Sequence, residues 1–225
     1  MTEPREEALP LTPDMLVARP QPGPIDFERG MRLWPPLILF LIAANVAMFG
    51  WEVAAGALTD RDTIIEAGAL VRDRVLAGEW WRLVSSAFLH ANVNHLIGNC
   101  VVLYIVGMAC EHALGFAQTA AVYFASAIGG SALSIAVRPG PSVGASGAIF
   151  GVLTAVVVVL YRNRNRYHLR DKRIGWVLGV WAAWQVLTGF LNPLVDNFAH
   201  LGGLAAGGAT ALACRPRLLA RSASR

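Results

Sequence analysis

The chain has 225 residues, of which 55% are hydrophobic and 15% are charged, and its mean hydropathy is +0.49. These values lie outside the range of soluble globular domains and predict a membrane protein with several spanning segments that form one domain. The net charge of +4 does not indicate a nucleic-acid partner, because the basic residues cluster in short stretches between apolar runs, where they set membrane orientation.

Residues 1–33 precede the first apolar run and contain six prolines together with charges of both signs. A segment of this composition cannot bury enough apolar surface to fold alone. We expect residues 1–33 to form a flexible cytoplasmic N-terminal tail.

Six apolar runs follow along the chain. They occupy residues 35–55, 94–110, 114–136, 146–161, 174–191 and 198–214. Each run approaches the roughly 20 residues with which a helix spans a bilayer core of about 30 Å. We therefore predict an all-α, polytopic membrane protein, with a six-transmembrane-helix bundle over residues 34–214.

Basic residues follow the fourth and the sixth apolar run. The first group is Arg162, Arg164, Arg166, Arg170, Lys172 and Arg173, and the second is Arg215, Arg217, Arg221 and Arg225. Lys and Arg are enriched in cytoplasmic loops, so both groups should be cytoplasmic, and residues 215–225 should form a basic cytoplasmic C-terminal tail. An even number of spans places the N-terminal tail on the same side. The second, fourth and sixth helices then run from the outside inward.

A long outer connection over residues 57–93 contains aromatic and aliphatic residues among several arginines. Trp80 and Trp81 next to Arg82 suit the membrane interface, where aromatic and basic side chains gather. We expect this loop to lie partly in the outer leaflet. An ordinary surface loop is the alternative.

The three cysteines, Cys100, Cys110 and Cys214, all fall within apolar runs and include no CxxC pair. That arrangement lacks the spacing of a metal site. We interpret the cysteines as buried small hydrophobic residues.

Four polar residues stand near the outer ends of the inward-running helices: His95, Asn99, Ser146 and His200. Polar residues inside membrane helices cost a few kcal/mol each and usually mark a function. For three of them, His95, Ser146 and His200, the first charge at the inner boundary follows 15 or 16 residues later. At 1.5 Å per residue these three lie roughly 22–24 Å above the cytoplasmic edge, which is several ångströms below the outer surface of the core.

This set of residues fits hydrolytic chemistry. A serine hydroxyl becomes a nucleophile when a base takes its proton, and a neutral imidazole is the usual base, so Ser146 and His200 supply that pair. Attack on a peptide carbonyl builds negative charge that donors must meet. His95 and Asn99 are four residues apart on one helix face and both can donate. Free backbone N–H groups at the start of the helix at 146–161 can add to them.

Small residues favour contact between the helices that carry the serine and the second histidine. Gly147 and Gly151 form one small-xxx-small pair, and Gly203 and Gly207 form another. We expect a close backbone approach that brings the Ser146 hydroxyl and the His200 imidazole within reach.

Other interpretations of these residues remain open. A serine in an apolar helix often only packs or bonds back to its own helix, and a membrane histidine can be structural. A zinc site at His90, His95 and His200 would lack the HExxH pattern. Ser146 stands in Gly-Ala-Ser-Gly-Ala, not in the G-x-S-x-G elbow of soluble hydrolases.

Three motifs stand in order along the chain: His95-Leu96-Ile97-Gly98-Asn99, Gly144-Ala145-Ser146-Gly147 and Ala199-His200-Leu201-Gly202-Gly203. They closely resemble the oxyanion, nucleophile and base motifs of the rhomboid family of intramembrane serine proteases. Trp81-Arg82 is similar to the family's signature in the outer loop, with Arg82 as a structural member. The resemblance covers about residues 35–214.

The resemblance implies a serine endopeptidase with a Ser146–His200 catalytic dyad, and with His95, Asn99 and Gly144 around the oxyanion and the substrate. It implies cleavage of single-pass membrane proteins within or near their transmembrane helix, in the lipid bilayer, without metal, nucleotide or nucleic acid. For a bacterial member, the expected location is the plasma membrane, with both termini cytoplasmic.

Three residues stand close to the dyad residues in the sequence: Phe150, Asp196 and Asn197. Some family members have a tyrosine stacked on the base where this chain has Phe150, which keeps the ring and loses the hydroxyl. Asp196 and Asn197 lie a turn before His200, at positions from which a polar side chain can orient an imidazole. Because the family works with a dyad, we interpret both as structural.

Two other functions compete with proteolysis. A non-catalytic rhomboid-like binder of membrane proteins is one alternative, although such relatives typically lack the serine or the histidine. A small transporter is the other. It would need a polar path toward the cytoplasm, and below the level of Ser146 the inward-running helices are almost wholly apolar.

Substrate access is expected to involve the helix at 174–191, which carries Trp176, Trp181, Trp184, Phe190 and Leu191. Bulky side chains of this kind can block a lateral entrance through which a substrate helix would reach the site. By analogy with the family we expect a gate between the second helix and the outer half of the fifth. Lipid-facing bulk is the alternative.

Overall fold

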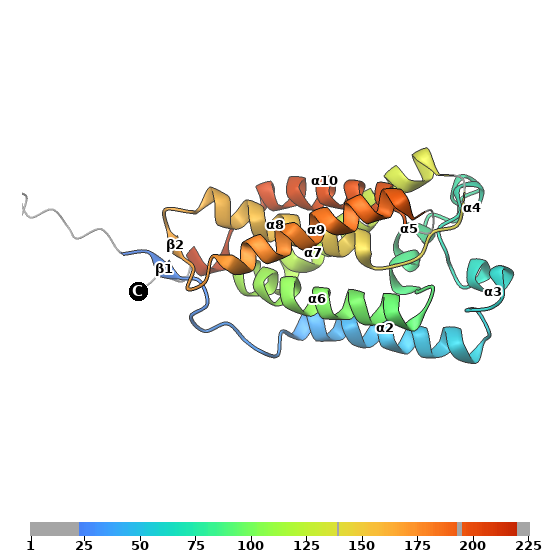
Figure 1. The fold of residues 1–225 in the computed structure, drawn as a ribbon, viewed down its shortest axis with the longest axis horizontal. Helices are drawn as coiled ribbons and strands as arrows, with labels where there is room; N and C mark the ends of the chain where they lie inside the picture. The colour runs from blue at the N-terminus through green and yellow to red at the C-terminus, as the bar shows by residue number, and fades with distance from the viewer. Residues whose placement is uncertain (1–22, 139, 193–194, 220–225) are drawn as a thin grey trace, which may run out of the picture.

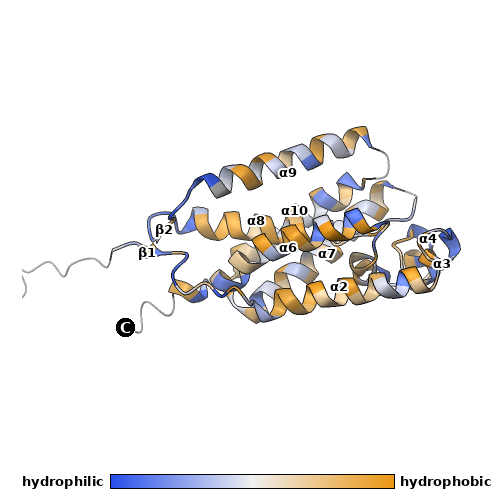
Figure 2. Cartoon of the chain, turned by 60° about the horizontal axis from the view of Figure 1, so that its bottom comes forward, coloured by the Kyte–Doolittle hydropathy of each residue, from blue (hydrophilic) through white to orange (hydrophobic). Residues whose placement is uncertain are grey.

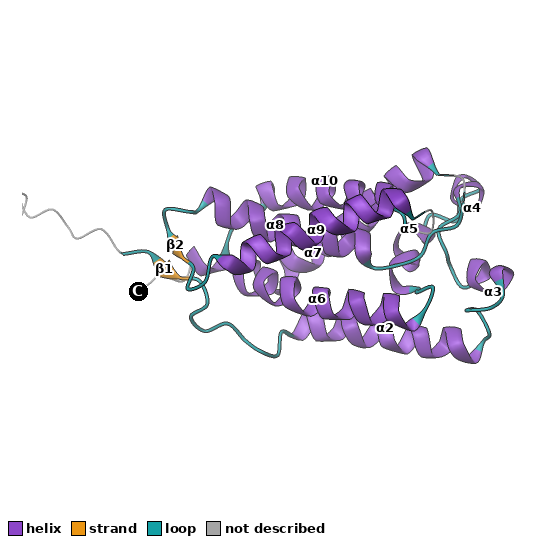
Figure 3. Ribbon diagram, viewed as in Figure 1, coloured by secondary structure: helices purple, strands orange, loops and turns teal. Residues whose placement is uncertain are grey.

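The computed structural model describes residues 23–138, 140–192 and 195–219, and this part of the chain is mostly helical (Figures 1 and 3). The long helices are α2 (Pro36–Ala54), α6 (Val93–Leu114), α7 (Phe116–Val137), α8 (Ser146–Arg162), α9 (Arg173–Leu191) and α10 (Asn197–Ala213). They lie at the positions of the predicted apolar runs. By length and hydropathy α2, α6 and α7 can each cross a membrane, whereas α8 and the Gly175–Leu191 part of α9 are apolar but shorter.

Local signals in the sequence define several helix ends. The Asn92 side chain accepts a hydrogen bond from the His95 backbone N–H at 3.0 Å and so caps the start of α6. Between α6 and α7 stands Gly115, whose φ of 80° favours glycine. Asp196 caps α10 by accepting from the Ala199 N–H at 3.0 Å. These caps set where His95 and His200 stand within the first turn of their helices.

Glycine lets α8 and α10 approach along their backbones, as the small-xxx-small pairs predict. A Cβ on Gly203 would overlap the backbone of Gly147, and one on Gly207 would overlap the backbone of Gly151. A Cβ on Gly147 would come within 2.9 Å of the Ala199 carbonyl oxygen. This contact brings the first turns of α8 and α10 together.

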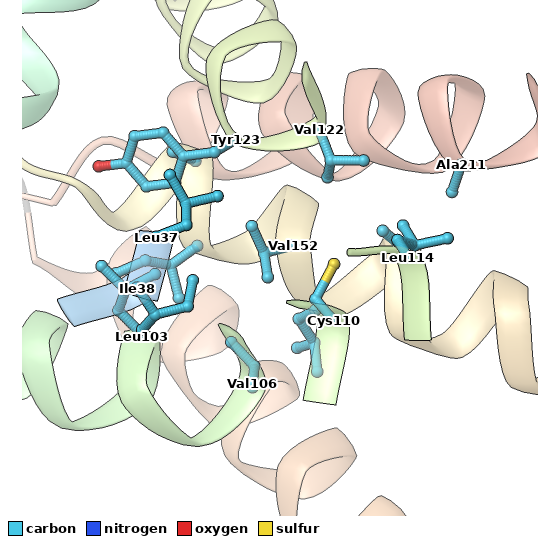
Figure 4. Packing of buried hydrophobic residues seen from close by; sticks show 14 of the residues in the cluster. Leu37, Ile38, Leu103, Val106, Cys110, Leu114, Val122, Tyr123, Val152 and Ala211 are labelled. Carbon is cyan, nitrogen blue, oxygen red and sulfur yellow. The ribbon is translucent and has the colours of Figure 1, made fainter. Parts of the chain in front are cut away.

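The apolar core fills the space between α2, α6, α7, α8 and α10 (Figure 4). Its labelled members in the figure are Leu37, Ile38, Leu103, Val106, Cys110, Leu114, Val122, Tyr123, Val152 and Ala211. Cys110 is fully buried, as predicted, whereas Cys100 and Cys214 are only partly buried. All three cysteines are free of disulfides.

Helix α9 is the least embedded of the long helices. Most of its apolar side chains are exposed, among them Trp176, Val177, Val180, Trp184, Leu187, Phe190 and Leu191. Figure 2 shows α9 at the edge of the bundle with apolar residues along it. An apolar helix face without protein neighbours is typical of contact with lipid.

The described part of the N-terminal segment is attached to the bundle. Strand β1 (Ile25–Asp26) pairs in parallel with β2 (Tyr167–His168), which lies between α8 and α9. Phe27 is buried, with its ring edge-on to both His112 and Tyr167 at 5.6 Å. Residues 23–33 therefore differ from the free tail expected for 1–33, because one aromatic side chain and one strand pairing anchor them. Residues 1–22 lie outside the described residues.

The C-terminal segment is likewise described in part. Leu218 and Leu219 pack against the core, within the segment 215–225 that the sequence predicts to be a tail. Residues 220–225 lie outside the described residues.

At the opposite end from the strands, the outer connection folds into short helices (Figure 1). They are α3 (Arg61–Glu66), α4 (Arg72–Leu76), α5 (Arg82–Ser85) and the 3-10 helix η1 (Ser86–Phe88). The buried Arg82 guanidinium donates to the carbonyls of Ile65 and Ala69 and pairs with the Glu79 carboxylate at 2.6 Å. Arg82 thus holds three parts of this connection together, in keeping with a structural role. The hydrogen bond from Arg82 also lowers the pKa of Glu79 below its ordinary value.

Candidate active site

Ser146 and His200 meet at the contact between α8 and α10. Ser146 is the first residue of α8, and His200 lies in the first turn of α10. The Ser146 Oγ and the His200 Nε2 are 2.9 Å apart, which is hydrogen-bonding distance. This is the geometry of a serine nucleophile beside its general base.

Aromatic packing orients the His200 ring. The ring of Phe150 stacks on it, with centroids 4.4 Å apart and planes inclined by 14°. Trp181 of α9 stacks on Phe150 in turn, at 5.7 Å. Phenylalanine at position 150 therefore retains the stacking that the resemblance implies for an aromatic residue there. Among the described residues the buried Nδ1 of His200 has no hydrogen-bond partner, so packing rather than a third polar residue holds the ring.

The hydrogen bonds of Asp196 and Asn197 go to helix ends and neighbouring helices and not to the His200 imidazole. Besides capping α10, Asp196 accepts a hydrogen bond from the Ser134 hydroxyl and lies 3.8 Å from the Arg138 guanidinium. The Asn197 amide donates to the Val186 carbonyl at 2.9 Å and so connects α10 to α9. These contacts agree with a structural interpretation of both residues, which stays a prediction.

A cavity of about 160 Å³ lies beside the dyad, between α6, α8 and α9. Its lining includes Asn94, His95, Gly98, Asn99, Val102, Ser146, Ile149, Phe150, Trp181 and Gln185. The structure thus brings His95 and Asn99 to the same cavity as Ser146. A small cavity with a hydroxyl and several donors on its wall suits the binding of a polar reacting group.

Gly144 lies two residues before the nucleophile and is not among the residues that line this cavity. Its φ is 133°, and a Cβ there would lie 2.6 Å from His95 Cε1 and 2.8 Å from His95 Nε2. Only glycine leaves room for the His95 ring against this stretch of backbone. The Gly144 N–H donates to the Ser86 carbonyl at 2.9 Å, which ties the segment before α8 to the outer connection.

Sequence reasoning considered His90 only as a zinc ligand and missed its buried partner Glu52, with which it lies behind Asn99. The Asn99 amide donates to the His90 Nε2 at 3.0 Å, and the His90 ring meets the His95 ring edge-on at 5.1 Å. The backbone N–H of His90 donates to the Glu52 carboxylate at 3.0 Å. Both residues are fully buried. A charge inside the first apolar run and a histidine nine residues before Asn99 are the signals that could have indicated them.

The bulky residues of α9 divide into two groups. Trp181 and Gln185 line the cavity, whereas Trp184 and Phe190 are each 62% exposed and lie outside the cavity lining.

Within the described residues, His, Cys, Asp and Glu side chains form no group of three or more that could hold a metal ion.

The chain matches a known protein family and is similar to several known proteins. Residues 77–217 match the family described as the Rhomboid domain. The chain is similar to Rhomboid protease GluP of Bacillus subtilis (strain 168), with 36% identity over 173 residues that cover 77% of this chain and 34% of the relative. It is 32% identical over 202 residues to Rhomboid protease AarA of Providencia stuartii, covering 79% of this chain and 72% of the relative. It is 33% identical over 187 residues to Putative rhomboid protease YdcA of Bacillus subtilis (strain 168), covering 81% and 89%.

The chain spans about a third of the length of GluP but most of AarA and YdcA. The matched family region contains Arg82, His95, Asn99, Ser146 and His200. It covers more than half of the chain, and the helices within it are apolar. The chain therefore belongs to the rhomboid family, as an integral membrane protein related to rhomboid proteases.

Proposed function

We propose that the chain is an intramembrane serine endopeptidase that cleaves single-pass membrane proteins within or near their transmembrane helix. The observation that carries this proposal is the 2.9 Å separation of Ser146 Oγ and His200 Nε2 at the edge of a cavity. The protease names of the relatives support the same reaction class.

The reaction begins with neutral His200 accepting the Ser146 proton at Nε2. The serine oxygen attacks the peptide carbonyl carbon and forms a tetrahedral intermediate with negative charge on the former carbonyl oxygen. His200 then donates the proton to the leaving amine, which releases one product and leaves an acyl ester on Ser146. Water, deprotonated by His200, hydrolyses that ester and restores the dyad.

The oxyanion is stabilised by donors on the cavity wall. Asn99 has two amide protons, and only one of them faces His90, so the second is available to the substrate. The His95 ring lies beside Gly144, next to the nucleophile. The first N–H groups of α8 are also available, because a helix start leaves them unpaired.

We further propose that all six long helices cross the bilayer, with both termini on the cytoplasmic side of a bacterial plasma membrane. Helices α8 and α10 have 17 residues each, which at 1.5 Å per residue gives about 25 Å, short of a core about 30 Å thick. Their outer ends, with Ser146 and His200, then lie below the outer surface, where the cavity admits water. Exposed Trp80 and Trp81 suit an outer connection that lies partly in the outer leaflet.

Substrate entry is proposed from the lipid side, between α6 and α9. The cavity is lined from both of these helices, and α9 has few buried residues to hold it in the bundle. A helix held so weakly can move aside at low cost.

The direct test is labelling of the purified full chain by a fluorophosphonate, which reacts with activated serines. The wild type should be labelled and should cleave a fluorogenic membrane-helix substrate, whereas Ser146→Ala should do neither while remaining folded. Binding of that substrate without labelling or cleavage would instead support a non-catalytic rhomboid-like binder. Labelling that persists in Ser146→Ala would point to another nucleophile.

A further inference from the structure

A second cavity, of about 240 Å³, lies at the end of the bundle opposite the proposed active site. It forms where the chain enters α2, where α6 gives way to α7, and where the C-terminal segment returns after α10. Its polar lining residues are Arg32, Glu111, His112 and Arg217. Two arginines from segments 185 positions apart therefore open into one cavity.

Hydrogen bonds to the bundle fix the backbone around both arginines. The Tyr104 hydroxyl donates to the Leu33 carbonyl at 2.7 Å, next to Arg32. The Gln118 side chain forms a reciprocal pair with Arg215, donating to its carbonyl at 2.9 Å and accepting from its N–H at 2.7 Å. The stem of Arg217 packs over Gly115, where a Cβ would lie 3.1 Å from Cδ. Defined contacts with the bundle therefore hold both segments that carry the arginines.

The charge balance of this cavity favours an anion. Neither Arg32 nor Arg217 forms an ion pair with any carboxylate in the part of the chain that the structure describes. The Glu111 carboxylate is engaged elsewhere, since it accepts from the N–H groups of Leu37 at 3.3 Å and Ile38 at 3.2 Å at the start of α2. The positive end of that helix compensates its charge. The His112 Nε2 faces the Phe27 carbonyl at 2.7 Å.

The apolar rim is defined here by Phe116, Leu33 and Trp34. Phe116 belongs to the lining and is 54% exposed, whereas Leu33 and Trp34, which follow Arg32 in the sequence, lie outside the lining and are 67% and 75% exposed. Exposed tryptophan next to basic residues at the end of membrane helices is typical of the lipid headgroup level. Guanidinium groups bind phosphate through two parallel hydrogen bonds. Acyl chains continuing from a bound phosphate would meet this apolar rim.

We propose that this cavity binds the phosphate of an anionic phospholipid, with Arg32 and Arg217 as its ligands and Leu33, Trp34 and Phe116 against the acyl chains. Basic pockets between membrane helices are suited to such headgroups. The bound lipid joins the start of α2 to the C-terminal segment across the α6–α7 turn.

The test measures lipid retention by the full chain and does not depend on proteolysis. The protein in uncharged detergent is incubated with equal amounts of phosphatidylglycerol and phosphatidylcholine of identical acyl chains, passed through gel filtration, and analysed for bound lipid by mass spectrometry. At about 1 kcal/mol for each basic residue, two arginines predict a preference for phosphatidylglycerol of about thirtyfold. The double variant R32Q/R217Q should lose most of this preference.

The matched control is a double variant that removes two positive charges at the same end of the molecule, from residues that do not line the cavity. Arg164 and Arg166 are exposed and absent from the lining, so R164Q/R166Q should retain the wild-type preference. An equal loss in the control, or no preference in the wild type, would overturn the site. Displacement of the lipid by excess inorganic phosphate would assign the site to a free anion instead. Should R32Q/R217Q fail to elute as a folded protein, R32Q alone, an exposed single change, must still lower the preference.

Discussion

Gly203 of α10 lies against the backbone of Gly147 of α8, so closely that a Cβ on Gly203 would overlap the Gly147 carbonyl group. Gly147 is the neighbour of Ser146, and Gly203 is three residues beyond His200. This contact therefore sets the distance between the hydroxyl and the imidazole.

Gly203→Ala should push the two helices apart, because the added methyl group meets backbone that cannot rotate away. Overpacking of this kind costs about 1–3 kcal/mol. We expect a lower melting temperature and slower fluorophosphonate labelling. Gly179→Ala is the matched control, since nothing lies within 4 Å of its Cβ position on α9, and it should neither lower the melting temperature nor slow the labelling. Equal effects of the two changes would refute the role of the glycine contact.

His200→Ala should abolish cleavage as completely as Ser146→Ala, because the serine then has no base within reach. The variant should keep its fold, since the ring mainly stacks on Phe150. Turnover of a membrane-helix substrate and the melting temperature are the measurements. Residual turnover that stays near the wild-type rate would mean that another group accepts the proton.

Asn99→Ala should lower the rate by about 10²–10³, the usual cost of one oxyanion donor, while leaving some turnover from the remaining donors. His95→Ala should be more severe, because its ring also packs against Gly144 and His90 beside the nucleophile. Single-turnover rates with saturating substrate separate this effect from binding. If both variants kept wild-type rates, neither side chain would be an oxyanion donor.

We expect His90 to position the Asn99 side chain, because the Asn99 amide donates a hydrogen bond to the His90 Nε2 at 3.0 Å. A small displacement of a catalytic group can cost up to about 10²-fold in rate. We expect His90→Ala to slow cleavage and the double change with Asn99→Ala to be no worse than Asn99→Ala alone, since the two residues form one unit. Additive losses in this double-mutant cycle would instead indicate a general structural role for His90.

Substrate access can be tested by shortening two sets of α9 side chains, those that are exposed and the one that lines the cavity. Trp184 and Phe190 face outward, so changing both to Ala should raise cleavage of a membrane-embedded substrate more than that of a short soluble peptide, which enters from the water side. Trp181→Ala should alter both substrates alike, because Trp181 stacks on Phe150 and so affects the setting of His200. Equal changes for the two substrates in the Trp184 and Phe190 variant would exclude a gate at these residues.

The class of the protein and the approximate positions of its long helices follow from the sequence alone, although the run at 94–110 ends four residues before α6 does. Hydropathy acts over neighbouring residues, so the apolar runs predict helices near their observed bounds, from Pro36–Ala54 to Asn197–Ala213. The motifs around His95, Ser146 and His200 likewise predict the site, since a hydroxyl and an imidazole at the same depth of an apolar protein have few other uses.

Contacts between distant segments were decided only by the tertiary structure. Glu52 and His90 are 38 positions apart, and neither hydropathy nor a motif indicates that the carboxylate meets the His90 backbone. The direction in which each α9 side chain points depends on the rotation of that helix against α8, which is why Trp181 rather than Trp184 reaches the cavity. Residues 25–27 have a tail-like composition, yet they pack because one strand pairing and the buried Phe27 ring hold them against the bundle.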